Sequence, residues 1–187
     1  DQAQAPEQFM NYSVSIIHSI NPLFFAILAL GLMLLGKFIY TLKTFPDLKA
    51  KSIKELVVGG VVMLGVVVLF VVLPLLSNIR IADDQLTLRL SSGFTTVSIA
   101  SDQVLSAELV TLNTDPATTI DDKVVGTSSR DYREGQFTMA DGSNASILLN
   151  GDQALMVKTT DQTLLLGPDN FDAFVADFNE NFYPVTQ

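Results

Sequence analysis

The sequence predicts a two-part chain: a hairpin of two transmembrane helices, followed by an α+β domain of seven antiparallel strands closed by a C-terminal helix. Two long apolar runs predict the helices. Short alternating runs predict the strands, and aromatic residues at helical spacing predict the last helix. We therefore divide the chain into an N-terminal segment (1–20), a helical hairpin (21–77) and a folded domain (78–187).

The composition argues against several classes of function. Only 17% of the 187 residues are charged, against about 25% in an ordinary soluble domain, which favours membrane segments. The net charge of −9 disfavours binding to nucleic acid, which requires a basic face. Cysteine is absent and His18 is the one histidine, so thiol catalysis and a histidine-rich metal site are excluded. We expect no catalytic residue, cofactor or metal.

The second apolar run, residues 56–76, contains no charged residue. As a helix it would extend roughly 32 Å, enough to cross a hydrocarbon core of about 30 Å. The first run, residues 22–42, contains one charge, Lys37, near its end, where a lysine can reach the headgroups. Asn21 and Pro22 form a good helix start. Both runs are predicted to be membrane spans.

The connector between the two runs, residues 43–55, is short and basic. Short basic loops stay on the cytoplasmic side, so the sequence predicts an integral membrane protein with its folded domain outside the cytoplasm. For the first residue, Asp1, two explanations stay open: cleavage of a signal peptide, or a chain that begins before it. Five of the seven lysines cluster around this connector: Lys37, Lys43, Lys49, Lys51 and Lys54.

Residues 8–20 have an apolar side, so we expect them to lie along the membrane surface or to extend the first helix.

Three hairpins are predicted in the domain. Alternating strands at 85–90 and 95–100 flank the turn Ser91-Ser92-Gly93. Strands at 136–140 and 145–149 flank a turn that begins Asp141-Gly142. Strands at 154–159 and 163–167 form the third pair, and residues 104–110 form a seventh strand.

The end of the chain changes period. Phe171, Phe174, Val175 and Phe178 recur at helical spacing after Pro168 and predict an amphipathic helix of about 12–14 residues.

Several of these residues match a known pattern. The stretch from Gly126-Thr127 through Tyr132, Gly135-x-Phe137 and the turn Asp141-Gly142 to the closing helix with Phe174 resembles the bacterial pleckstrin-homology (PH) family. The resemblance extends over residues 79–181. It implies a PH-like domain, a strongly bent antiparallel sheet or barrel closed by a C-terminal helix, and some members carry a preceding hairpin of membrane helices.

The resemblance also implies binding of a lipid headgroup, but the cations that such sites use are missing. Family members that bind phosphoinositides carry Lys and Arg on the first two strands and the loop between them, because phosphate needs charge-assisted hydrogen bonds. Here the loop is Ser91-Ser92-Gly93-Phe94, with only Arg89 nearby.

The densest polar cluster, residues 130–134, is a candidate partner-binding loop with Arg130, Tyr132 and Arg133 as contacts, because arginine and tyrosine are favoured at interfaces. The alternative is a solvated loop with internal Arg–Asp pairing.

We expect a membrane-anchored, non-catalytic interaction or scaffold module, or an accessory subunit of a membrane protein complex. The resemblance implies that this membrane is the bacterial inner membrane. The partners would be the bilayer and a protein or second copy, bound at an open sheet edge or by the loop 111–134. The alternatives are a lipid-headgroup or small-ligand module at the membrane surface and, third, an enzyme.

Overall fold

A computed structural model describes residues 10–14, 22–44, 54, 57–62, 64–65, 68, 76–91 and 94–186. The chain divides into two compact units. Residues 20–72 form one unit, and residues 1–19 together with 73–187 form the other. The second unit is therefore built from two stretches of sequence, with the first unit inserted between them.

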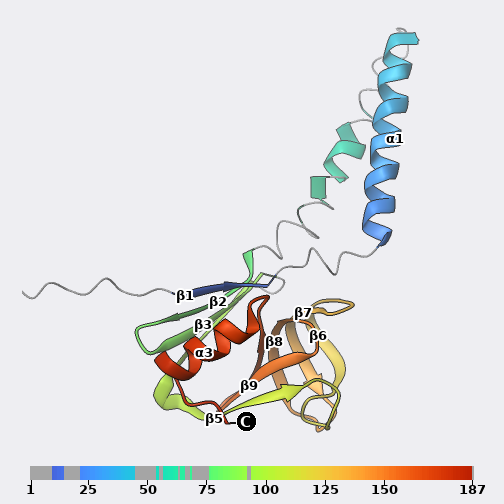
Figure 1. The fold of residues 1–187 in the computed structure, drawn as a ribbon. Coiled ribbons are helices and arrows are strands. Elements are labelled where there is room, and N and C mark those ends of the chain that lie inside the picture. The colour runs from blue at the N-terminus through green and yellow to red at the C-terminus, as the bar shows by residue number, and fades with distance from the viewer. Residues whose placement is uncertain are drawn as a thin grey trace, which may run out of the picture. The chain divides into compact units, whose positions relative to one another are not determined.

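Helix α1 (Pro22–Thr44) is the main element of the inserted unit (Figure 1). It begins at the predicted Pro22 and ends two residues beyond the predicted boundary. Residues 57–62 and 64–65 are also helical, whereas the rest of the predicted second span and most of the connector lie outside the described residues. In the part of the chain that the structure describes, no helix combines the length and the mean hydropathy of a membrane span.

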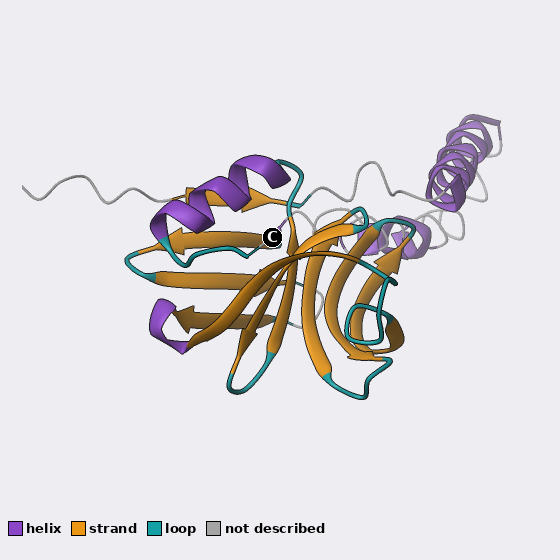
Figure 2. Ribbon diagram, turned by 60° about the horizontal axis from the view of Figure 1, so that its bottom comes forward, coloured by secondary structure: helices purple, strands orange, loops and turns teal. Residues whose placement is uncertain are grey.

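The folded domain consists of two separate sheets and a helix (Figure 2). The first sheet has the strand order β1-β2-β3-β4 and the second has the order β5-β9-β10-β8-β7-β6. A 3₁₀ turn, η5 (Ser101–Gln103), precedes β5. The strands are β1 (Met10–Ser13), β2 (Asn78–Ala82), β3 (Gln85–Leu90), β4 (Thr95–Ala100), β5 (Val104–Thr111), β6 (Ile120–Ser129), β7 (Tyr132–Met139), β8 (Asn144–Asn150), β9 (Gln153–Thr159) and β10 (Thr163–Gly167).

Strand β1 contradicts our expectation for residues 8–20. Met10–Ser13 is a strand, neither a surface helix nor an extension of α1, and it pairs antiparallel with β2. Ser13 lies opposite Asn78, so the chain leaves the sheet and returns to it at neighbouring positions. A run of four residues is too short for its alternation to indicate a strand. Its partner β2 follows more than sixty residues later, so the local sequence does not show the pairing.

The first sheet shows the alternation that its sequence predicts. Ile79, Ile81, Leu86 and Leu88 are buried on one face, and the residues between them are polar or small. The second sheet is different, because β8, β9 and β10 bury consecutive side chains on both faces. Two hydrophobic clusters flank it, one shared with the first sheet and the helix and one on its other face.

The three predicted hairpins are confirmed as the antiparallel pairs β3–β4, β7–β8 and β9–β10. The predicted all-antiparallel arrangement is wrong in one place, because β10 pairs in parallel with β8. Such a pair joins strands that are not neighbours in the sequence, and no local pattern indicates it.

Two further features of the predicted domain are corrected. The sheets are not closed into a barrel, and the described residues between 78 and 186 form nine strands where we predicted seven. The two additional strands are β2 and β6. Strand β6 lies within the predicted loop 111–134 and is mostly exposed, so it lacks the apolar alternation that marks a strand in sequence.

Helix α3 (Phe171–Asn181) confirms the predicted C-terminal helix and is slightly shorter than expected. Its Phe174 and Phe178 are fully buried in the cluster shared with the first sheet. The Tyr12 ring of β1 meets the Phe174 ring edge-on, with centroids 5.2 Å apart. The Tyr12 hydroxyl also donates a hydrogen bond to the Asp177 carboxylate of α3. The N-terminal strand thus packs against the C-terminal helix.

Candidate functional site

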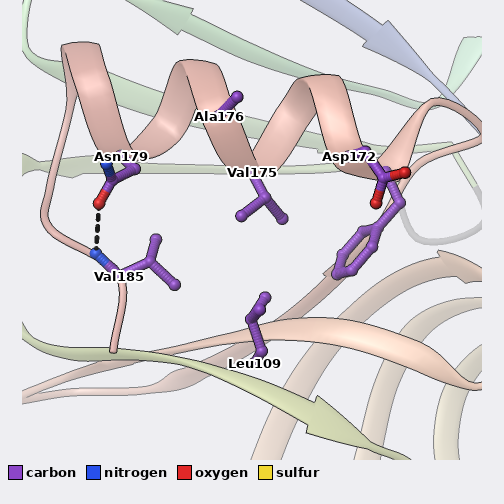
Figure 3. A pocket seen from close by; sticks show the side chains of 7 residues that line it. Leu109, Asp172, Val175, Ala176, Asn179 and Val185 are labelled. Atoms are coloured by element: carbon purple, nitrogen blue, oxygen red, sulfur yellow. Dashed lines mark hydrogen bonds between the residues drawn. The ribbon is translucent and has the colours of Figure 1, made fainter. Parts of the chain in front are cut away.

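A groove lies between α3, β5 and the C-terminal tail (Figure 3). Its volume is about 430 Å³. Aliphatic and aromatic side chains form most of its surface, and two polar side chains come from α3. The lining residues are Leu109, Phe171, Asp172, Val175, Ala176, Asn179 and Val185.

The groove exists because α3 has two apolar positions per turn that face different surroundings. Phe174 and Phe178 point into the core. Phe171 and Val175 lie on the neighbouring side of the helix and are only half-buried. Leu109 of β5 faces the same space and is 40% exposed. An apolar strip along α3 is therefore left uncovered beside β5.

The C-terminal tail lies along β5 at this groove. The Thr186 N–H donates to the carbonyl oxygen of Ala107 at 2.9 Å, and the Leu109 N–H donates to the carbonyl oxygen of Thr186 at 3.4 Å. This is a single parallel bridge between Thr186 and Glu108. The Val185 N–H donates to Asn179 Oδ1 at 2.9 Å, drawn as the dashed line in Figure 3. The tail shows that the β5 edge can bind an extended backbone.

The three predicted contact residues lie around a tight turn. Strands β6 and β7 are joined by Arg130 and Asp131, so most of the expected loop is strand. Arg130 is exposed and adopts a φ of 48° in this turn. Arg133 is half-buried, and its Nη1 donates to the carbonyl oxygens of Asp131 and Gly151 at 3.4 and 3.5 Å. A partner-binding role for these two arginines stays a prediction.

Tyr132 is not a surface contact, because its side chain is fully buried. Its hydroxyl donates to Glu134 Oε2 at 2.7 Å. The other oxygen of this buried carboxyl group accepts hydrogen bonds from the hydroxyls of Ser77, at 2.7 Å, and Ser91, at 3.0 Å. Burial, together with the neighbouring Glu134 carboxyl, raises the pKa of Tyr132 above its ordinary value. Tyr132 therefore belongs to an internal polar network that fixes Ser77 and Ser91 to β7.

With the fold and the groove described, we compared the chain with known proteins. The family model described as "Bacterial PH domain" matches residues 78–181, more than half of the chain. The chain belongs to the bacterial PH domain family. No curated protein and no solved structure matched it.

The match begins at the first residue of β2, so β1 of this PH domain lies outside it. The match ends at the last residue of α3, and the tail that borders the groove lies outside it as well. In the loop where the resemblance implied a headgroup site, Ser91 is buried and hydrogen-bonded to Ser77 and Glu134.

The sequence contained partial signals for the groove. The helical spacing of Phe171 and Val175 predicted an apolar face, but nothing indicated that part of it stays uncovered. The residues of the PH domain that the sequence analysis missed are Ser77, Glu134 and the tail. The local sequence gives one sign of this network: Glu134 follows Tyr132 by two residues and so lies on the same face of β7. The serines come from distant segments, so no local pattern links them to Glu134.

Proposed function

We propose that this bacterial PH domain is a membrane-attached, non-catalytic interaction module, acting as a scaffold or as an accessory subunit of a membrane protein complex. We further propose that the groove between α3 and β5 binds an extended segment of a protein partner. The observation that carries this proposal is the C-terminal tail beside β5, with Val185 in the groove and Thr186 paired to the strand.

We base the proposed binding mode on the contact between the tail and β5. Backbone groups of a sheet edge provide hydrogen bonds to an added strand, and adjacent pockets select its side chains. The tail already uses the Ala107 and Leu109 backbone groups of this edge, so a partner segment would replace the tail on β5. Leu109, Phe171 and Val175 would then provide an apolar surface for one aliphatic side chain. Asp172 at the groove and the acidic composition of the chain favour a partner segment that carries basic residues.

Membrane attachment is supported by the inserted unit. Large apolar side chains of α1 are exposed, among them Phe25, Leu32 and Met33, and water would not favour such a surface. Valines at 57, 58, 61 and 62 are exposed in the same way. Because Ser13 and Asn78 are neighbours in one sheet, an inserted segment that crosses a bilayer must cross it an even number of times. Two crossings by the predicted hairpin satisfy this condition.

The test is affinity purification of the intact chain in mild detergent, with mass spectrometry of the proteins that stay bound. Leu109→Asp places a charge in the groove, and Leu105→Asp is the matched control on the same strand, because Leu105 is also exposed and does not line the groove. We expect Leu109→Asp to remove the stoichiometric partner and Leu105→Asp to retain it. Equal retention by both variants would exclude the groove as the binding site.

The volume of the groove supports a second candidate. About 430 Å³ is within the range of small-ligand sites, so a small apolar ligand is the alternative occupant. Native mass spectrometry of the same sample distinguishes the two. A bound small molecule that is lost in Leu109→Asp, without any bound protein, would favour a ligand-binding module.

A further inference from the structure

The two sheets of the domain have four outer strands, and three of these edges are protected. An exposed edge attracts other strands, and natural proteins usually block it with a cover, a charge or a bulge. On β1, the Ser13 carbonyl oxygen accepts a hydrogen bond from the Asp169 N–H at 3.2 Å, and β5 is paired with the tail at Thr186. Strand β6 contains two register shifts and the charged residues 121–123.

The fourth edge, β4, has none of these protections in the part of the chain that the structure describes. It pairs with β3 without a register shift, and it contains no charged residue and no proline. Its sequence, Thr-Thr-Val-Ser-Ile-Ala, is rich in β-branched residues, which favour strands. Val97 and Ile99 are buried, whereas Thr96 and Ser98 are exposed. Strand β4 is therefore a regular and neutral edge.

Two hydrogen bonds at the end of β4 show which backbone groups face outward. The Ser101 N–H donates to the carbonyl oxygen of Asp84 at 3.0 Å, on the side of β3. In an antiparallel ladder this direction alternates from one residue to the next. Accordingly, the Ala100 N–H points away from β3, and the side-chain Oε1 of Gln103 accepts its hydrogen bond at 2.9 Å.

The same alternation turns the backbone groups of Thr96 and Ser98 outward, where no strand of the described residues pairs with them. A second copy of β4 fits these groups when the two strands run antiparallel with Val97 opposite Val97. Thr96 of each copy then lies opposite Ser98 of the other, and both pairs exchange backbone hydrogen bonds. Cross-strand pairs of hydroxyl side chains are themselves favourable. The edge is thus complementary to itself.

The charges around β4 favour the same antiparallel arrangement. The acidic residues near the end of β4 are Asp83, Asp84 and Asp102, with Asp161 and Lys158 on the adjoining β9–β10 hairpin. At the start of β4, the exposed Arg89 lies opposite Thr96, and the turn 91–94 carries no charge. Antiparallel pairing places the acidic end of each copy beside the Arg89 end of the other. Asp169 contacts β1, at the far edge of this sheet.

We propose that this PH domain forms a homodimer through β4, in which two four-stranded sheets join into one continuous antiparallel sheet across a two-fold axis at Val97. Phe94 fits this arrangement. It directly precedes β4, its side chain is 85% exposed, and in this register it lies beside Ala100 of the second copy. The dimer goes beyond the proposed function, because it uses none of the residues that line the groove on β5.

Cysteine crosslinking of the full-length chain in mild detergent tests the register, because the chain has no cysteine of its own. Val97→Cys places two thiols across the axis, at a Cα separation of about 4.5 Å, which a disulfide can span. Ser98→Cys is the matched control. Ser98 is more exposed, but its two copies lie on a diagonal about 7–8 Å apart. We expect a mild oxidant to crosslink Val97→Cys well and Ser98→Cys poorly. Equal or reversed yields would overturn the proposal.

Charged pairs at the two exposed positions provide a second test. Thr96→Lys with Ser98→Lys places like charges opposite each other in the dimer, whereas Thr96→Lys with Ser98→Glu places opposite charges there. Native mass spectrometry in mild detergent should give the dimer mass for wild type and for the Lys–Glu variant, and half that mass for the Lys–Lys variant.

The Lys–Glu variant also controls for folding, because it differs from the Lys–Lys variant at one exposed residue. A monomeric wild type, a dimer that persists in the Lys–Lys variant, or loss of the dimer in both variants would each overturn the proposal. Leu109→Asp should stay dimeric, so failure of the groove as a binding site is distinguishable from failure of the dimer.

Discussion

The carboxyl group of Glu134 accepts three side-chain hydrogen bonds inside the domain. It has no exposed surface, and it binds the hydroxyls of Tyr132, Ser77 and Ser91. A buried carboxyl group costs free energy unless its oxygens are satisfied. The three hydroxyls meet this requirement, and they join β7 to the residues on either side of the β2–β3 hairpin. The network therefore also positions the turn that carries Phe94.

This network predicts a loss of stability in alkali. The pKa of Tyr132 is raised in the folded state, so the folded protein holds the phenolic proton more tightly than the unfolded chain does. The resulting stability is fully present below the unfolded pKa of about 10 and is lost as pH rises above it. Tyr132→Phe removes one hydrogen bond and should cost about 1–2 kcal/mol at pH 7.

The same substitution should make the fall in stability above pH 10 shallower. It should not abolish the fall, because the pKa of Tyr12 is also raised, by burial and by Asp177. Denaturant unfolding of wild type and Tyr132→Phe between neutral pH and pH 11 measures both effects. Parallel curves for the two proteins would show that Tyr132 does not couple folding to pH.

At the scale of elements, the pairing of β6 with β7 depends on two glycines. Gly126 and Gly135 lie opposite each other, with φ values of 147° and 130°. A Cβ atom built on Gly126 would lie 2.1 Å from the carbonyl oxygen of Glu134, and one on Gly135 would lie 2.1 Å from that of Val125. The two backbones approach more closely than any side chain allows.

We therefore expect Gly126→Ala to destabilise the domain by about 3 kcal/mol, because the neighbouring backbone cannot move aside without breaking the strand pair. The matched control is Gly142→Ala. Gly142 also has a positive φ, 83°, but a Cβ there has no neighbour within 4 Å. This control should cost only about 1 kcal/mol, from backbone strain. Equal losses of stability in thermal unfolding would mean that the close approach is not what requires glycine.

The elements that could be predicted from sequence are those whose signals are local. The three hairpins combine alternating side chains with turn residues, and α3 shows its aromatic period within a few residues. Strand β6 was missed because it is exposed on both faces. The parallel pairing of β8 with β10 was missed because β9 lies between these two strands in the sequence. For the site, Phe171 and Val175 were predicted as an apolar face, whereas Tyr132 was misread as a surface residue. Its burial depends on Ser77 and Glu134, which no local pattern connects to it.

At the scale of the whole molecule, the predicted orientation in the membrane is open to a direct experiment. We expect the lysine-rich connector on the cytoplasmic side and the PH domain on the other side. Since the chain has no cysteine, Lys49→Cys and Thr111→Cys are unique labelling sites. A membrane-impermeant maleimide applied to intact spheroplasts should label Thr111→Cys, and Lys49→Cys should react only after the cells are opened. The reverse pattern would place the domain in the cytoplasm.

The pairing of β1 with β2 also determines the order in which this molecule can fold. β1 is synthesised first, but its partner strand follows only after the entire inserted unit has been made. At about 5–20 residues per second, this delay lasts on the order of several seconds. During that interval Tyr12 and its neighbours must stay unpaired. Completion of the first sheet therefore reports that the whole inserted unit has been made.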